Sequence, residues 1–126
     1  MSRRLPLEDV RPTQLYLSKE KLARVLEWFD VDDPNCGSLP AFEHEGAWYF
    51  SDGHTRAFVA ALAGADTVRI HHDERVREEY NFEVYRTCID WCAEEGIETI
   101  HDLCGRVVEP DTYEECWIGR CQRLGE

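Results

Sequence analysis

The sequence predicts an α+β fold, with a small mixed sheet flanked by helices and followed by a C-terminal helical extension. Two observations support this class. Short segments with strand character alternate with helical segments up to about residue 72, and helical spacing dominates from residue 73 onward. The length of 126 residues suits one domain with a single core. We therefore expect a core over residues 1–72 and a helical extension over residues 73–126 that packs on it.

The first segments are predicted from local signals. Residues 5–17 contain two prolines and favour an extended lead-in with an edge strand. Ser18 is a suitable N-cap for a helix over residues 19–29. The apolar residues of that helix recur at spacings of three and four, so they share one face, made of Leu22, Val25, Leu26 and Phe29.

The middle of the chain predicts a hairpin, a helix and a strand. Residues 39–51 favour a hairpin whose turn is Glu45-Gly46. The alanine-rich run over residues 57–63 predicts a short buried helix that ends at Gly64. Residues 67–71 then have the composition of a strand.

The extension is predicted to be helical. Apolar residues recur at helical spacing from Val76 to Cys92, and a short helix is expected over residues 100–103. Pro110 suits the first position of a last helix. One face of that helix would carry Tyr113, Cys116, Trp117, Arg120 and Leu124. We expect this face to pack on the first half of the chain rather than to bind a partner.

The net charge of −12 is unevenly distributed. Residues 1–30 carry a net charge of +1, whereas residues 73–126 carry −9. A strongly acidic surface repels phosphate backbones, so DNA is not the expected partner, although the N-terminal half can still host an anion site. No stretch approaches the roughly 20 apolar residues of a membrane helix, and no signal peptide is recognisable. We therefore expect a cytoplasmic protein with no membrane partner.

The six cysteines can be interpreted in two ways. They are Cys36, Cys88, Cys92, Cys104, Cys116 and Cys121. Without a secretory signal we expect reduced thiols, most of them half-buried as small apolar side chains. Zinc is the alternative, because Cys88 and Cys92 are four residues apart and His71, His72 and His101 are available. The chain has no Cys-x-x-Cys pair, however.

The segment Asp52-Gly53-His54-Thr55-Arg56 lies between a predicted strand and a predicted helix. Such a turn directs backbone N–H groups and the positive end of the helix dipole at one place, which favours an anion. Arg56 can reach back as a forked donor, and His54 could also move a proton. Asp52 could hold magnesium or accept a proton. The alternative is an ordinary turn that Thr55 caps and in which Arg56 pairs with a surface carboxylate.

This arrangement resembles the ParB/sulfiredoxin-like superfamily over about residues 5–72. ParB-type domains carry Gly-Glu-Arg-Arg at the turn, sulfiredoxins carry Gly-Cys-His-Arg, and the ParB-like free serine kinases carry Asp-Gly-His-His-Arg, which is closest to this chain. The resemblance implies that nucleotide phosphates, with ATP or ADP as the expected nucleotide, contact Gly53, His54, Thr55 and Arg56.

The resemblance also implies a general base, and here the chain departs from the family. The serine kinases use a glutamate near the first helix, and Glu20 lies in a comparable region, although an acidic residue also suits any first helical turn. Thr55 replaces their second histidine. His54 replaces the sulfiredoxin cysteine, so sulfinic acid reduction is not implied. No helix-turn-helix region follows, so chromosome partitioning is not implied either.

Two functions follow as hypotheses. The first is a small-molecule phosphotransferase or nucleotide hydrolase that uses ATP or ADP, with or without Mg²⁺, and has Asp52, His54 and Glu20 as candidate catalytic residues. The second is a non-catalytic module that senses a nucleotide or another phosphorylated ligand and acts through a protein partner. Only the first consumes nucleotide, so turnover separates the two.

Overall fold

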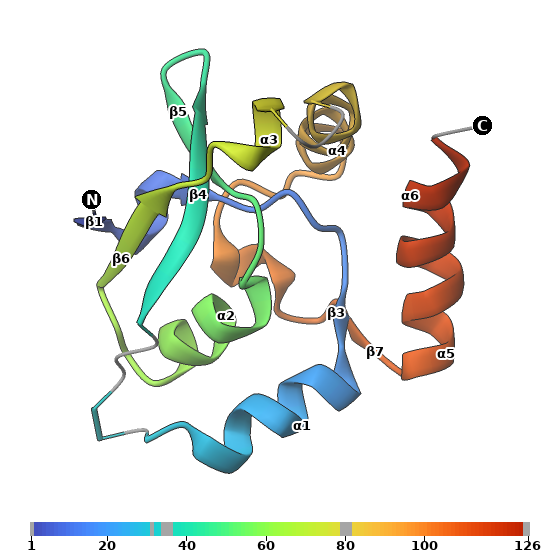
Figure 1. Cartoon of the computed structure of the whole chain (residues 1–126). Helices are drawn as coiled ribbons and strands as arrows, with labels where there is room; N and C mark the ends of the chain where they lie inside the picture. The colour runs from blue at the N-terminus through green and yellow to red at the C-terminus, as the bar shows by residue number, and fades with distance from the viewer. Residues whose placement is uncertain (1, 31, 34–36, 79–81, 125–126) are drawn as a thin grey trace.

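The computed structural model describes residues 2–30, 32–33, 37–78 and 82–124, so Cys36 lies outside the described residues (Figure 1). Its centre is a curled five-stranded sheet in the order β1-β6-β4-β5-β2, flanked by helices. The predicted α+β class is therefore confirmed. The strands of this sheet are β1 (Ser2–Pro6), β2 (Val10–Arg11), β4 (Ser38–His44), β5 (Ala47–Phe50) and β6 (Thr67–His72).

The N-terminal segment supplies both edges of the sheet, because β1 begins before the predicted lead-in of residues 5–17 and β2 lies within it. At one edge β1 pairs antiparallel with β6, and at the other β2 pairs parallel with β5. Between them β4 is parallel to β6 and forms the predicted antiparallel hairpin with β5. The hairpin turn has positive φ at Glu45 (50°) and Gly46 (83°), as a tight two-residue turn requires. A short 3-10 turn, η1 (Leu7–Asp9), separates the two edge strands.

Two helices contact each other beside the sheet, α1 (Lys19–Trp28) and α2 (His54–Leu62). The Ser18 hydroxyl accepts a hydrogen bond from the Lys21 amide and caps α1, as predicted. The predicted apolar face of α1 is only partly buried, because Leu26 is 52% exposed. Helix α2 begins three residues before its predicted start, so the whole His54-Thr55-Arg56 segment is helical.

Residues 73–78 and 82–124, the described part of the second half, contain helices and one strand. Strand β7 (Val107–Val108) pairs parallel with β3 (Leu17–Ser18), which corrects the expectation of a purely helical extension. A two-residue strand has no periodicity that the sequence could reveal. The helices are α3 (Arg75–Glu78), α4 (Phe82–Glu94), η2 (Ile100–Leu103), α5 (Pro110–Tyr113), η3 (Glu114–Ile118) and α6 (Gly119–Arg123).

The last three helices follow one another without a gap and form one column (Figure 1). The middle one, η3, is a π-helical turn. Within η3 the Gly119 amide donates to the Glu114 carbonyl, five residues earlier instead of four. This wider turn shifts the buried face. Tyr113 and Trp117 are buried as predicted, but Cys116 is exposed and Cys121 packs on the core in its place.

One hydrophobic core joins both halves of the chain. Leu15 and Val59 from the first half belong to the same buried cluster as Ile100, Leu103 and Trp117 from the second. In the part of the chain described here, the five cysteines are free thiols and no three metal-ligating side chains gather. None of the described helices is both long enough and apolar enough to cross a membrane.

Candidate functional site

The loop between β5 and α2 forms a tight turn that only glycine fits well. Gly53 is the N-cap of α2 and has φ +76°, in the left-handed region. A Cβ atom on Gly53 would lie 3.0 Å from Leu39 Cδ2 and 3.1 Å from Arg56 Nη2. The Arg56 guanidinium therefore folds back over the turn. The Gly53 amide donates to Asp52 Oδ1 at 2.8 Å, which orients the Asp52 carboxylate.

A cavity of about 160 Å³ opens at this turn and includes the start of α2. Arg56 and Lys21 bring two positive charges to it, and Asp52 brings one negative charge. The first N–H groups of an α-helix have no partner within the helix, and the helix dipole adds partial positive charge there. We name this space the turn cavity, and its lining residues are Gln14, Lys21, Asp52, Gly53, His54, Thr55, Arg56 and Tyr113.

His54 is buried beneath the turn, with an exposure of 2%. Its Nε2 accepts a hydrogen bond from the Thr13 amide at 2.9 Å, and the Thr13 hydroxyl donates to the Phe50 carbonyl at 2.7 Å. Burial lowers the pKa of His54 to about 4, although the nearby Asp52 charge acts to raise it. The ring is therefore neutral at pH 7.

The neutral ring of His54 has one donor to offer. Because Nε2 accepts from Thr13, the proton of the neutral ring is assigned to Nδ1. Nδ1 is buried and has no hydrogen-bond partner among the described residues. A buried donor without a partner costs free energy, so this position of the ring is maintained by the packing around it.

Three residues of the turn cavity were not predicted as site residues, namely Gln14, Lys21 and Tyr113. Gln14 Nε2 donates to the Tyr113 hydroxyl at 3.2 Å, across 99 positions of sequence. Lys21 Nζ lies 5.0 Å from the centre of the Tyr113 ring. Burial is the main cause that raises the pKa of Tyr113 to about 12. The sequence predicted Tyr113 only as a packing residue, because no local pattern relates it to the turn.

Glu20 does not share this location. It lies on the exposed side of α1, forms an ion pair with Arg24, and is not among the residues that line the turn cavity. The structure therefore brings together Asp52, Gly53, His54, Thr55 and Arg56, and it leaves Glu20 apart from them.

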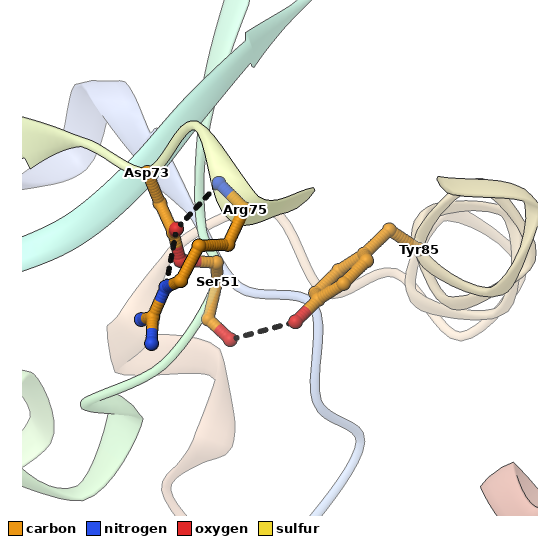
Figure 2. Close-up of polar contacts among 4 residues, drawn as sticks. All are labelled: Ser51, Asp73, Arg75 and Tyr85. Carbon is orange, nitrogen blue, oxygen red and sulfur yellow. Dashed lines mark hydrogen bonds and ion pairs between the residues drawn. The ribbon is translucent and has the colours of Figure 1, made fainter. Parts of the chain in front are cut away.

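A second cavity, of about 300 Å³, is also lined by Asp52, and Figure 2 shows its four other lining residues. The Ser51 hydroxyl donates to Asp73 Oδ2 at 2.7 Å. The Arg75 amide and Nε both donate to Asp73 Oδ1, at 3.1 and 3.2 Å. Tyr85 reaches in from α4, and its hydroxyl donates to the Ser51 carbonyl at 3.4 Å. We name this space the Tyr85 cavity.

Asp73 organises the Tyr85 cavity. The residue is only 5% exposed, and its amide donates to the Ala41 carbonyl at 2.7 Å. Burial acts to raise the pKa of Asp73, but hydrogen bonds from Ser51 and Arg75 and the charge of Arg75 outweigh it and lower the pKa. Asp73 is therefore ionised at neutral pH and holds Ser51 and Arg75 in place.

Neither a family model nor a curated protein matches this chain. Among solved structures, it is similar to the crystal structure of protein Atu1540 from Agrobacterium tumefaciens, with a TM-score of 0.55 and 16% sequence identity. The match covers 99% of this chain and 69% of that chain. At this identity the similarity concerns the fold alone.

Proposed function

We propose that the chain binds the phosphate group of a nucleotide in the turn cavity. The convergence of Lys21, Arg56 and the start of α2 on one cavity of about 160 Å³ is the observation that supports this. Positive side chains and exposed helix amides are the groups that proteins use to bind phosphate.

Asp52 is suited to share a magnesium ion with such a ligand. Magnesium in phosphate sites is commonly bound by one or two carboxylates together with phosphate oxygens and water. Asp52 is exposed and lines the turn cavity, so it can supply one carboxylate. The bound ion would reduce the repulsion between Asp52 and the phosphate.

The family to which we assign this site is the ParB/sulfiredoxin-like superfamily. The Asp52–Arg56 motif resembles that of the ParB-like free serine kinases, and a mixed sheet flanked by helices is compatible with the assignment. Gly53 at positive φ and Arg56 folded over it are the features that a phosphate-binding turn requires. On this proposal the expected nucleotide is ATP or ADP.

The first candidate function is an enzyme that transfers or hydrolyses a phosphoryl group. Phosphoryl transfer depends mainly on positioning and on charge neutralisation, which Lys21, Arg56 and a magnesium ion on Asp52 would supply. Asp52 is the carboxylate that lines the turn cavity, and as the alternative to holding magnesium it would accept the proton of a phosphate acceptor or of water. This arrangement would support a small-molecule phosphotransferase or a nucleotide hydrolase.

The second candidate function is a non-catalytic nucleotide-sensing module. It is favoured by the position of the two other candidate catalytic residues. His54 is buried with a pKa of about 4, so it is a weak base, and Glu20 is not among the residues that line the turn cavity. Nucleotide turnover separates the two functions, because both bind and only the enzyme releases phosphate or a phosphorylated product.

The test is a thermal-shift panel with ATP, ADP, CTP, GTP and inorganic phosphate, with and without Mg²⁺. A ligand at 100 times its dissociation constant adds about 2.7 kcal/mol to the free energy of unfolding, a shift on the order of 10 °C for a domain of this size. We expect such a shift with the wild-type protein and its loss in Arg56→Ala and Lys21→Ala.

Lys19→Ala is the matched control for Lys21→Ala. Both lysines lie on α1, but Lys19 pairs with Glu109 at the surface. It removes one positive charge without changing the turn cavity, and the shift should persist. An absence of any shift with all five ligands, or an equal loss in all three variants, would overturn the proposed function.

A further inference from the structure

The turn cavity and the Tyr85 cavity share Asp52, and the shared carboxylate suggests one divided site rather than two separate ones. Ser51 and Asp52 are consecutive in the loop that leads into α2, and Ser51 lines only the second space. A ligand with its phosphate at the start of α2 would therefore have the Tyr85 cavity directly beside it.

The charges of the two cavities differ in sign. In the turn cavity Lys21 and Arg56 outweigh Asp52. In the Tyr85 cavity Asp52 and Asp73 outweigh Arg75, which already donates to Asp73. A second phosphate in the Tyr85 cavity would face this negative excess at short range, which is unfavourable. An uncharged group with hydroxyl donors is favoured there, because carboxylate oxygens only accept hydrogen bonds.

The remaining walls of the Tyr85 cavity are suited to a sugar. Ser51 adds a hydroxyl, and Tyr85 adds an aromatic ring that is anchored against Phe42 at a centroid distance of 5.4 Å. The ion pair of Asp73 with Arg75 holds the polar wall in place before a ligand arrives (Figure 2). A rigid wall reduces the entropic cost of binding.

We propose that the ligand is a phosphate ester of a sugar, with the phosphate in the turn cavity and the sugar hydroxyls against Asp52 in the Tyr85 cavity. This inference rests on the proposed phosphate site and names the part of the ligand that lies beyond the phosphate. A ribose phosphate can belong to a nucleotide or be a free sugar phosphate, and the two share this chemistry.

The test is calorimetric titration of the whole chain in magnesium-free buffer with inorganic phosphate, ribose 5-phosphate and AMP, using wild type and Asp52→Asn. Asparagine keeps an oxygen that can accept from the Gly53 amide. We expect Asp52→Asn to bind inorganic phosphate several-fold more tightly, because a repelling charge is removed. The preference for ribose 5-phosphate over phosphate should fall about tenfold, because a charged hydrogen-bond acceptor is lost.

If Asp52 had a purely structural role, Asp52→Asn would weaken the binding of both ligands. A higher affinity for phosphate together with a lower preference for ribose 5-phosphate is therefore diagnostic. Ser51→Ala and Tyr85→Leu should lower the preference for ribose 5-phosphate without changing phosphate affinity. Asp66→Asn, in the connection between α2 and β6, is the charge-matched control and should change neither.

Tighter binding of AMP than of ribose 5-phosphate would identify a nucleotide, and equal binding would identify a sugar phosphate. If the preference for ribose 5-phosphate is unchanged in Asp52→Asn, Ser51→Ala and Tyr85→Leu while phosphate still binds, the inference is wrong and the proposed function stands. If phosphate binding is absent from wild type, or unaffected by Arg56→Ala, both fail.

Discussion

Gly53 shows how much of the site depends on one residue. Its left-handed φ of +76° would cost a residue with a side chain about 1–2 kcal/mol. A Cβ atom would also come within 3.1 Å of the Arg56 guanidinium. We expect Gly53→Ala to lower the free energy of unfolding by about 2 kcal/mol and to weaken phosphate binding, as measured by urea unfolding and calorimetry.

Gly64 supplies the control at the other end of the same helix. It has φ +94°, but a Cβ atom there would meet nothing within 4 Å. Gly64→Ala should therefore introduce backbone strain without a close contact. We expect it to lower the free energy of unfolding by less than Gly53→Ala does and to leave ligand binding unchanged. Equal losses of stability and binding in the two variants would show that the contact with Arg56 is unimportant.

His54 makes the stability of the protein depend on pH. Its folded-state pKa of about 4 lies below the ordinary value of 6.5, so the unfolded chain takes up this proton more readily. The stabilisation is complete above about pH 6.5 and is lost as the pH falls toward 4. Between pH 7.5 and pH 5 this group accounts for a loss of about 2 kcal/mol, measurable by urea unfolding at both values.

His54→Gln is the comparison for this effect. A glutamine side chain can still accept from the Thr13 amide, but it does not titrate. When the pH falls from 7.5 to 5, the free energy of unfolding of the variant should decrease by about 2 kcal/mol less than that of wild type. This comparison does not depend on how stable the variant is at pH 7.5. The same pH dependence in both proteins would mean that folding does not lower the pKa of His54.

At the scale of elements, the last helices are anchored to the core by aromatic packing. Trp117 is 5% exposed, and its ring lies 6.1 Å from that of Trp91 on α4. Removing a buried tryptophan side chain costs about 3–5 kcal/mol, through lost burial and the cavity left behind. We expect Trp117→Ala to show this loss in urea unfolding and to weaken ligand binding, because Tyr113 lies one turn earlier.

Trp28 is the matched control, since it is a tryptophan on α1 with 56% of its surface exposed. Trp28→Ala should change the free energy of unfolding by less than about 1 kcal/mol. A loss as large as that of Trp117→Ala would mean that the Trp28 surface is covered in solution.

At the scale of the whole molecule, the two halves share one hydrophobic core. Residues 1–72 contain the complete five-stranded sheet, yet Leu15 and Val59 are buried in a cluster completed by Ile100 and Leu103. Strand β3 would also lose its partner β7. We expect a fragment of residues 1–72 to lack cooperative unfolding and dispersed amide resonances, whereas the whole chain unfolds in one transition.

Co-expression of residues 73–126 is the matching experiment. The separate segment should restore folding of the fragment, because β7 and the apolar residues after position 84 would complete the same core. A stable, cooperatively unfolding fragment of residues 1–72 would instead show that the extension is a separate addition.

Local patterns predicted the elements well and the contacts between distant segments poorly. The hairpin turn at Glu45-Gly46, the Ser18 cap and the Gly64 helix end depend on residues within four positions of one another. The β3–β7 pair and the contact of Gln14 with Tyr113 join segments about 90 or more residues apart. The π-helical turn in η3 also escaped prediction, because it depends on how the last helix packs.

The sequence by itself determined the fold class, the boundaries of α1, the β4–β5 hairpin, β6 and η2 to within one residue, and the Asp52–Arg56 turn, because backbone preference and hydrophobic spacing are local properties. Only the tertiary structure decided what surrounds that turn. It brought Lys21 and Tyr113 to the turn cavity, left Glu20 apart, buried His54 as a neutral ring and placed Asp73 beside Ser51. These outcomes depend on the three-dimensional packing of distant segments, because burial and proximity, rather than residue type, set the charge and partners of each side chain.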